Sequence, residues 1–291
     1  MATNDATNEP RGDMTPPNAA AGARGRGHAR AFRGLHAEGL LLLANAWDAG
    51  SARLIESLGA KALATTSAGV AWSHGYADGD ELPVSALVAT VAAIVRAVNV
   101  PLTVDVEGGY SNDPDRVGEA IAAVVDAGAV GVNLEDGAGD PDLLCAKIER
   151  AKRAAARLGV DLFVNARTDV YLRGLAPPAG RVEAVLARAG RYRAAGADGL
   201  FVPGLTAPDE IKAIASAAQL PLNVMARPGL PGAAELKALG VRRLSAGSAI
   251  AQIALGTTAS LASAFLRTGA SDPLGQGAMP YAEINALMAP R

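Results

Sequence analysis

Two consecutive apolar segments in the middle of the chain end in acidic residues. Asp105 and Glu107 end the first segment, and Glu135 and Asp136 end the second. Burying a carboxylate costs several kcal/mol unless it is paired, hydrogen-bonded or bound to a cation. Because Asp105 and Glu107 are two residues apart, both side chains can point to the same side of a strand. Helix caps and a loop charge are the alternative interpretation, but the recurrence in consecutive segments favours a divalent-metal site. Oxygen ligands without His or Cys favour Mg²⁺ or Mn²⁺ over Zn²⁺.

Strand-like and helix-like segments alternate along most of the chain. The predicted strands cover residues 40–45, 60–66, 102–106, 131–134, 162–166, 199–202, 222–225 and 242–245. The predicted helices cover residues 49–57, 84–98, 114–127, 141–158, 181–195, 207–217, 233–239 and 248–267. In the helix at 114–127, the spacing of Val117, Ile121 and Val124 is that of one buried face.

This alternation predicts an α/β fold with parallel strands and right-handed crossovers. The simplest closure is a (β/α)8 TIM-type barrel, and a doubly wound open sheet is the alternative. Polar residues follow nearly every predicted strand instead of gathering at one switch point, which favours the barrel. In a barrel, the chemistry lies at the C-terminal ends of the strands.

The residues predicted at these strand ends suit the binding of a small anion. Arg167 can grip a carboxylate or phosphonate with two parallel hydrogen bonds, although it could instead neutralise Asp169. Thr66 and Ser67, with the backbone amides that follow, could bind a second oxyanion. Trp47, Asn165 and Asn223 are further substrate-binding candidates at the same ends.

Two nearby residues are candidates for acid–base work, and the lysines are not. His74 is the histidine nearest the predicted mouth, and Tyr110 follows the first acidic strand. A Schiff-base aldolase would need a lysine at the mouth. All five lysines fall on predicted helices or at the N-terminal end of a strand, so that mechanism is not expected.

Composition limits the classes of partner. The net charge of −2 suggests neither a nucleic acid nor an anionic membrane. Cys145 is the one cysteine, so an internal disulfide framework is excluded. No continuous apolar run approaches the roughly 18 residues of a membrane span, and no secretory signal pattern is evident, so a cytoplasmic protein is expected. We expect a disordered tail over residues 1–30, a barrel over 31–268 and a C-terminal extension over 269–291.

Several motifs together resemble one family. They are Asn-Ala-Trp-Asp at 45–48, Thr-Thr-Ser-Ala-Gly at 65–69, Val-Asp-Val-Glu-Gly-Gly-Tyr at 104–110, Val-Asn-Leu-Glu-Asp at 132–136 and Asn-Ala-Arg-Thr-Asp at 165–169. In this order they resemble the isocitrate lyase/phosphoenolpyruvate mutase superfamily over roughly residues 38–268. The resemblance implies a barrel whose eighth helix often swaps onto a neighbouring subunit, giving a dimer or tetramer. It also implies Mg²⁺ and a small α-oxo acid or related carboxylate, with a C–C or P–C bond made or broken next to an enolate.

The resemblance also assigns roles to individual residues. Asp105 matches the direct metal ligand, and Glu107 and Glu135 match acids that hold the metal, often through water. Arg167 matches the arginine that binds the substrate carboxylate, and Asp78 matches an aspartate that approaches the metal site. The loop that cradles the carboxylate and oxo oxygens corresponds to Thr66, Ser67, Ala68 and Gly69.

The chain departs from the family after the second acidic strand. The lyase branch carries a Lys-Lys/Arg-Cys-Gly-His segment there, whereas here residues 137–140 lead directly into a predicted helix. Cys145 lies inside that helix, where a packed thiol is expected. Decarboxylation needs the least extra machinery, because departing CO₂ requires no base. We therefore expect a Mg²⁺-dependent lyase of oxaloacetate-like acids. The alternatives are a phosphonate P–C mutase or hydrolase, a methylisocitrate-type lyase, and a catalytically idle barrel that binds a metabolite.

Overall fold

The protein is described here from a computed structural model, which covers residues 19–289. Nine parallel strands form one sheet in the order β1-β9-β8-β7-β6-β5-β4-β3-β2. The sheet closes into a barrel because β1 and β2 are consecutive pieces of one extended segment, separated by Ala44. β1 pairs with β9 and β2 pairs with β3, so the barrel has eight strand positions and the doubly wound alternative is excluded. The strands are β1 Leu41–Leu43, β2 Asn45–Ala46, β3 Leu63–Thr65, β4 Leu102–Asp105, β5 Gly131–Glu135, β6 Phe163–Arg167, β7 Gly199–Phe201, β8 Leu222–Met225 and β9 Arg243–Ser245.

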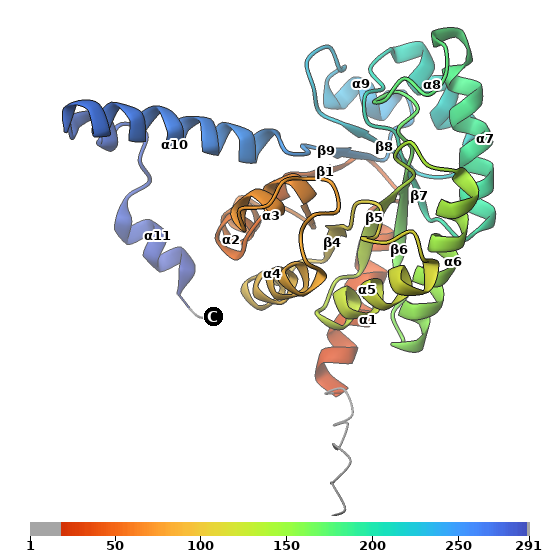
Figure 1. Cartoon of the computed structure of the whole chain (residues 1–291), viewed down its shortest axis with the longest axis horizontal. Coiled ribbons are helices and arrows are strands. Elements are labelled where there is room, and N and C mark those ends of the chain that lie inside the picture. The colour runs from red at the N-terminus through yellow and green to blue at the C-terminus, as the bar shows by residue number, and fades with distance from the viewer. Residues whose placement is uncertain (1–18, 290–291) are drawn as a thin grey trace, which may run out of the picture.

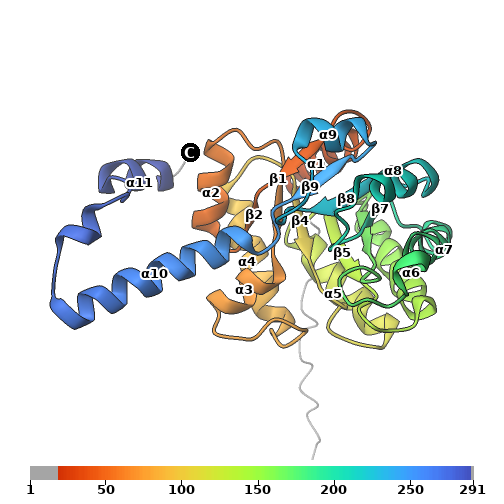
Figure 2. The same ribbon diagram turned by 90° about the horizontal axis from the view of Figure 1, so that it is seen from above.

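Helices surround this barrel, as Figures 1 and 2 show. The surrounding α-helices are α2 Ala49–Ser57, α4 Val84–Ala97, α5 Pro114–Asp126, α6 Pro141–Arg157, α7 Arg181–Ala194, α8 Pro208–Ala217 and α9 Ala233–Ala238. α5 buries Val117, Ile121 and Val124 against the sheet, which confirms the predicted apolar face. Asp113 and Asp140 cap α5 and α6 by accepting a hydrogen bond from a first-turn amide, with proline at the start of each helix.

A helix at the N-terminal end of the chain packs under the barrel (Figure 1), where the sequence predicted a disordered tail. α1 spans Ala19–Gly34, so the disorder expected over residues 1–30 is wrong for 19–30, and residues 1–18 lie outside the described part of the chain. Phe32 is fully buried and meets the ring of Phe163 edge to face at 5.5 Å. A low apolar content and many glycines suggested disorder, but Ala29 and Phe32 belong to a buried cluster with Phe163 of the barrel, which holds α1 on the barrel floor.

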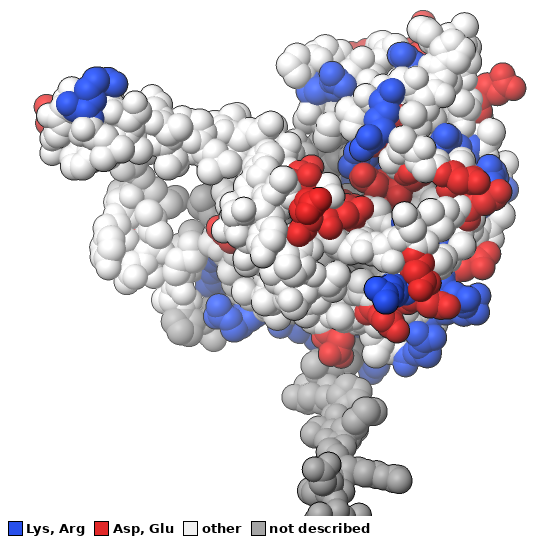
Figure 3. All heavy atoms as spheres, viewed as in Figure 1, with Lys and Arg blue, Asp and Glu red and all other residues white. Residues whose placement is uncertain are grey.

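The chain after β9 leaves the barrel. α10 spans Ala249–Thr268 and projects away from the other helices (Figures 1 and 2). Ala251 is its one buried residue, and Ile253 and Leu266 are 70% and 84% exposed. Figure 3 shows the projecting arm with few charged side chains. This eighth helix does not cover its own barrel, and its swap onto a neighbour stays a prediction.

α10 is also the one helix of the described chain long and apolar enough to cross a membrane. Its 20 residues do not form a continuous apolar run, because Gln252, Gly256 and several hydroxyl residues interrupt the sequence. The following segment contains the short 3-10 turn η2 Asp272–Gly275 and α11 Tyr281–Met288. α11 returns to α2, where Arg53 Nε donates to the Leu287 carbonyl at 2.8 Å. The chain therefore folds back from the far end of α10 onto α2 of the barrel.

Candidate active site

The C-terminal ends of the strands surround a cavity of about 170 Å³. Every strand position of the barrel contributes to its wall, as expected when all strands run in one direction. Its polar residues are Asn45, Thr66, Ser67, Asp78, Asp105, Asn133, Arg167, Ser245 and Ser248. Five of the residues predicted for the site therefore meet here with their side chains or backbone, together with Ala68.

Asp105 ends β4 with its carboxylate held by backbone only. Its Oδ1 accepts from the Glu107 amide at 3.4 Å, and its own amide donates to Thr65 Oγ1 at 2.9 Å. Among residues 19–289, no lysine or arginine lies within ion-pair distance of this carboxylate. Burial raises the pKa of Asp105, and the more distant Arg167 guanidinium only partly opposes that rise. The carboxylate is thus poised for a cation that the protein itself does not supply.

Strand register explains why Glu135 and Arg167 lie together. The two residues are directly paired between β5 and β6, and Arg167 Nη1 lies 2.5 Å from Glu135 Oε2. Burial raises the pKa of Glu135 to about 8, and nearby Asp105 adds to the rise while Arg167 opposes it. The pKa of Glu135 rises in spite of its ion pair with Arg167, because burial and the neighbouring carboxylates outweigh the pair. The same guanidinium also pairs with Asp169.

Arg167 is held by several neighbours. Its Nε and Nη2 donate to the two oxygens of fully buried Asp169 at 2.7 and 3.1 Å. Its guanidinium carbon lies 5.9 Å from the centre of the Phe201 ring on β7. The neutralisation of Asp169 that the sequence left open is therefore present. Arg167 also lines the cavity, so the pairing orients the guanidinium and does not bury it away from a substrate.

Glu107 turns toward the loop that carries Asp78. Its Oε2 accepts from the amides of Gly79, at 2.8 Å, and of Asp80. Asp80 Oδ1 in turn accepts from the Tyr110 amide at 3.0 Å. Asp80, Glu107 and Tyr110 have φ angles of 61°, 52° and 60°, a left-handed conformation that is uncommon for residues other than glycine. This cross-linked pair of loops stores backbone strain and holds Asp78 over the cavity.

Asp136 has a structural environment, in contrast to Glu135 beside it. It is buried and accepts from Tyr192 Oη at 2.5 Å, from Arg188 Nη1 at 2.6 Å and from the Asp169 amide at 3.0 Å. Both of its carboxylate oxygens accept hydrogen bonds inside the protein, and its side chain is not exposed. Asp136 therefore links α7 to the end of β5 and does not face a ligand.

The side chains around the cavity offer oxygen ligands to a metal ion. In the described part of the chain, no group of three or more His, Cys, Asp or Glu residues converges as closely as direct coordination by all of them requires. The donors near the cavity are nonetheless all oxygens, and burial raises the pKa of Asp105, Glu107 and Glu135 alike. Glu135 pairs with Arg167 and Glu107 accepts two backbone amides, whereas Asp105 has no cationic partner among residues 19–289. This arrangement suits a hard cation that would bind Asp105 directly and the two glutamates through water. The residues therefore fit Mg²⁺ or Mn²⁺ with a mainly hydrated shell.

Several predicted residues lie beside the cavity instead of in its wall. Asn165 and Asn223 are buried and do not line the cavity, and Asn165 Nδ2 donates to Asn133 Oδ1 at 2.9 Å. Trp47 packs beside Gly69, whose missing Cβ would stand 2.9 Å from Trp47 Cβ. Gly69 is thus a packing residue of α3, the helix Ser67–Ser73 that forms where a cradling loop was expected.

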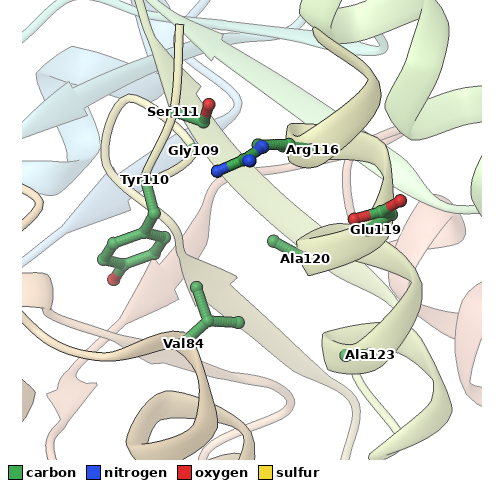
Figure 4. Close-up of a pocket in the computed structure, with 8 residues that line it drawn as sticks. All are labelled: Val84, Gly109, Tyr110, Ser111, Arg116, Glu119, Ala120 and Ala123. Atoms are coloured by element: carbon green, nitrogen blue, oxygen red, sulfur yellow. The ribbon is translucent and has the colours of Figure 1, made fainter. Parts of the chain in front are cut away.

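The two acid–base candidates also lie outside the cavity. His74 ends α3, and its Nε2 is 2.8 Å from Thr90 Oγ1 on α4. Tyr110 lines a separate outer pocket with Val84, Arg116 and Glu119 (Figure 4). Its hydroxyl reaches Glu107 Oε1 at 3.3 Å, and burial raises the pKa of the phenol. Neither residue reaches the cavity in this arrangement.

The structure adds two cations that sequence reasoning did not place. Lys147 on α6 donates to the Gly108 carbonyl at 2.6 Å and lines a second cavity with Glu107 and Glu135, although it was expected away from the mouth. Arg243 is fully buried inside the barrel, and its Nη2 donates to Asn133 Oδ1 at 3.2 Å. Arg243 lies within a predicted strand, and a charged residue there was the sequence signal for it. Only the sheet register shows that its side chain points into the barrel.

A TIM-type barrel with oxygen donors and an arginine around one mouth defines a barrel enzyme that handles small carboxylates or related anions. The model of the phosphoenolpyruvate phosphomutase family matches residues 32–266. The chain belongs to this family, within the isocitrate lyase/phosphoenolpyruvate mutase superfamily, as the sequence motifs indicated.

Individual relatives agree with this assignment. An uncharacterized protein of Mycobacterium tuberculosis is 37% identical over 263 residues, covering 88% of this chain and 95% of its own. Oxaloacetate decarboxylase of Paraburkholderia xenovorans is 31% identical and covers 76% of each chain. A crystal structure from Burkholderia cenocepacia, provisionally assigned as a phosphonomutase, is 44% identical with a TM-score of 0.77, covering 82% of this chain and 99% of its own. Members of the superfamily are lyases or mutases, so the chain is an enzyme of this kind.

Proposed function

We propose that the protein is a Mg²⁺-dependent lyase that acts on a small α-oxo or α-hydroxy carboxylate, with decarboxylation of an oxaloacetate-like acid as its main reaction. The supporting observation is that Asp78, Asp105 and Arg167 line one small cavity at the mouth of the barrel. The likeness to oxaloacetate decarboxylase points to the same substrate class. We further propose that it works in the cytoplasm and that α10 joins copies of the chain into a dimer or tetramer.

Each residue of the cavity has its own proposed role in binding the metal or the substrate. Asp105 would hold Mg²⁺, with Glu107 and Glu135 supporting its water shell. When bound, the ion would polarise the oxo group and stabilise an enolate. Arg167 would bind the substrate carboxylate with its guanidinium oriented by Asp169 and Phe201. Thr66, Ser67 and the backbone at Ala68 would contact its remaining oxygens, and Asp78 would close the mouth from its loop.

The missing catalytic segment favours decarboxylation over the alternatives. Residues Gly137, Ala138, Gly139 and Asp140 connect β5 to α6 with no room for the Lys-Lys/Arg-Cys-Gly-His segment of the lyase branch. Cleavage of a methylisocitrate-type substrate requires a base for the hydroxyl and an acid for the enolate. His74 and Tyr110 do not line the cavity, so neither supplies these groups. Loss of CO₂ requires neither a base nor a lid-borne acid, because water can protonate the enolate.

A comparison of three substrates tests this proposal. With Mg²⁺, the enzyme should release pyruvate from oxaloacetate faster than succinate from methylisocitrate or phosphate from phosphonopyruvate. Because Mg²⁺ itself promotes decarboxylation of oxaloacetate in solution, Asp105→Asn protein under the same conditions supplies the background rate. Dominant release of succinate or phosphate would replace the decarboxylase assignment with a methylisocitrate-type lyase or a P–C hydrolase. No turnover of any of the three would favour a metabolite-binding barrel without activity.

The oligomer proposal has its own test. Light scattering coupled to size exclusion should give a dimer or tetramer, because the exposed apolar residues of α10 need a partner surface. Ile253→Asp should shift the protein toward monomer, whereas the same change at Leu58, exposed on the surface after α2, should not. A monomeric parent protein would contradict the swap.

A further inference from the structure

The cavity at the barrel mouth has two unlike walls. Asp78, Asp105 and Arg167 lie on the polar wall described above. The other wall is apolar and consists of Leu172, Phe201, Pro203 and Met225. These four residues come from adjacent segments, namely the loop after β6, the end of β7 with its loop, and the end of β8. The apolar residues are therefore segregated on one side of the cavity.

The strand order places this wall opposite the candidate metal site. In a ring of eight strand positions, β8 stands four positions from β4, and β7 stands four positions from β3. Met225 at the end of β8 thus faces Asp105 across the cavity, and Phe201 at the end of β7 faces the end of β3 beside Thr66. A substrate whose carboxylate and oxo group lie at the polar wall must direct its far end toward Met225 and Phe201.

Charge at the far end of a substrate would have no partner there. Of the lysines and arginines in residues 19–289, Arg167 alone lines this cavity. Its guanidinium carbon lies 5.9 Å from the centre of the Phe201 ring, but it pairs with Glu135 and Asp169 and, in the proposed function, binds the first carboxylate of the substrate. Arg227 follows Met225 by two residues, but it is exposed and does not line the cavity. An anion moved from water to an apolar wall without a cation or hydrogen-bond donors is strongly disfavoured.

We propose that Leu172, Phe201, Pro203 and Met225 form the distal subsite of the active site and select a group without charge. The ligands that bind best are small α-oxo acids with an alkyl group beyond the oxo carbon, and oxaloacetate would place the carboxylate that it loses against the same wall. This inference rests on the proposed function, which supplies the polar end of the site.

The subsite also suits the decarboxylation step. When the C–C bond to a carboxylate at this wall breaks, its electron pair passes into the oxo group to form the enolate, and the carboxylate leaves as neutral CO₂. The apolar wall is then better matched to the product than to the reactant.

A matched pair of probes tests the subsite on the intact protein with Mg²⁺. 2-Oxopentanoate and 2-oxoglutarate both have five carbons and differ by a methyl group against a carboxylate at the far end. Oxalate carries the polar end alone. By calorimetry, we expect oxalate to bind and 2-oxopentanoate to bind at least about tenfold more tightly than 2-oxoglutarate, a ratio of the size that one mismatched group produces.

Substitution of one wall residue adds an independent test. Met225→Lys places a cation in the subsite and should bring the ratio of the two affinities to about one or below. It should also lower KM for oxaloacetate and lower kcat, since it stabilises the carboxylate before it leaves. Met225→Leu should keep the parent preference, which guards against misfolding as an explanation. Met279→Lys, in the C-terminal segment at 43% exposure, is the matched control and should leave the preference unchanged.

The outcomes separate this inference from the proposed function. If oxalate fails to bind in the presence of Mg²⁺, the proposed carboxylate site is wrong and the subsite falls with it. If oxalate binds and 2-oxoglutarate binds as tightly as 2-oxopentanoate or more tightly, the apolar subsite is overturned while the proposed function stands. That second result would point to Arg227 moving into the mouth to pair with the distal anion.

Discussion

Replacement of Arg167 by lysine separates the geometry of its guanidinium from its charge. In the structure, the guanidinium makes two hydrogen bonds to buried Asp169, at 2.7 and 3.1 Å, and an ion pair with Glu135 at 2.5 Å. A lysine ammonium cannot reproduce the planar fork that meets Asp169 with two parallel bonds. A hydrogen bond to a charged group contributes about 1.5–3 kcal/mol, so losing one bond should lower the free energy of unfolding by about 2 kcal/mol. Arg173, 2.9 Å from the same carboxylate, limits the loss.

The catalytic effect of Arg167→Lys should be larger than its effect on stability. The substrate carboxylate would lose its two-point contact while the residual charge is shared with Asp169 and Glu135. We expect kcat/KM for oxaloacetate to fall by about 2–4 kcal/mol, the size found when one partner of a buried charged pair is truncated. That corresponds to roughly 30- to 1000-fold. Denaturant unfolding and steady-state kinetics on the same preparation measure both effects.

A control on the same buried acid makes this test specific. Arg173 also pairs with Asp169, but its side chain is 52% exposed and does not line the cavity. Because Arg173 is half exposed and Asp169 keeps its bonds to Arg167, Arg173→Lys should lower the free energy of unfolding by about 1 kcal/mol or less and leave the kinetics unchanged. Unchanged kinetics for Arg167→Lys would refute its role in substrate binding. Equal kinetic losses in both variants would show that the effect arises from Asp169 and not from the substrate.

Three further predictions concern the acids and the cysteine. Asp105→Ala should abolish Mg²⁺ binding in calorimetry while the circular dichroism of the barrel is unchanged. If the variant binds Mg²⁺ as tightly as the parent protein, the metal site lies elsewhere. The pKa of Glu135 is raised to about 8 in the fold, so the folded metal-free protein holds a proton that the unfolded chain has lost. Its free energy of unfolding should therefore fall as the pH rises from about 5 to about 8, and Glu135→Gln should flatten that fall in chelator-treated protein. A slope that persists in the variant would assign the proton to another group. Cys145 lies half-buried on α6 and lines none of the cavities at the mouth, so Cys145→Ala should keep most activity and lose about 1 kcal/mol of stability. A folded but inactive variant would revive a mechanism in which the thiol acts on the substrate.

The periodicity of the sequence was sufficient for the barrel. All eight predicted strands and their helices are present, because each segment repeats its apolar residues at the period of its own secondary structure. Both ends of the described chain were harder to predict. α1 has few apolar residues, and its stability comes from Phe32 against the barrel floor. α10 is regular and apolar, yet its sequence does not say whether it covers its own barrel or leaves it.

Which strand-end residues face the substrate was only partly predictable. Parallel strands bring their C-terminal ends to one mouth, and this rule alone located Asp105, Arg167 and Thr66. It could not separate Asn133, which lines the cavity, from Asn165, which supports Asn133 from the next strand. The two are direct partners in the sheet, so neither the sequence nor the strand register alone decides which of them lines the cavity.

The sequence by itself thus determined the fold class, the family and the order of functional residues around the barrel mouth. These depend on local periodicity and on short motifs, which are complete within each segment. The tertiary structure alone decided the state of those residues: the pairing of Arg167 with Glu135 and Asp169, the turn of Glu107 toward the loop of Asp78, and the apolar wall opposite Asp105. Charge compensation, pKa and shape all depend on distances between segments far apart in the chain, and those distances exist only once the barrel has closed.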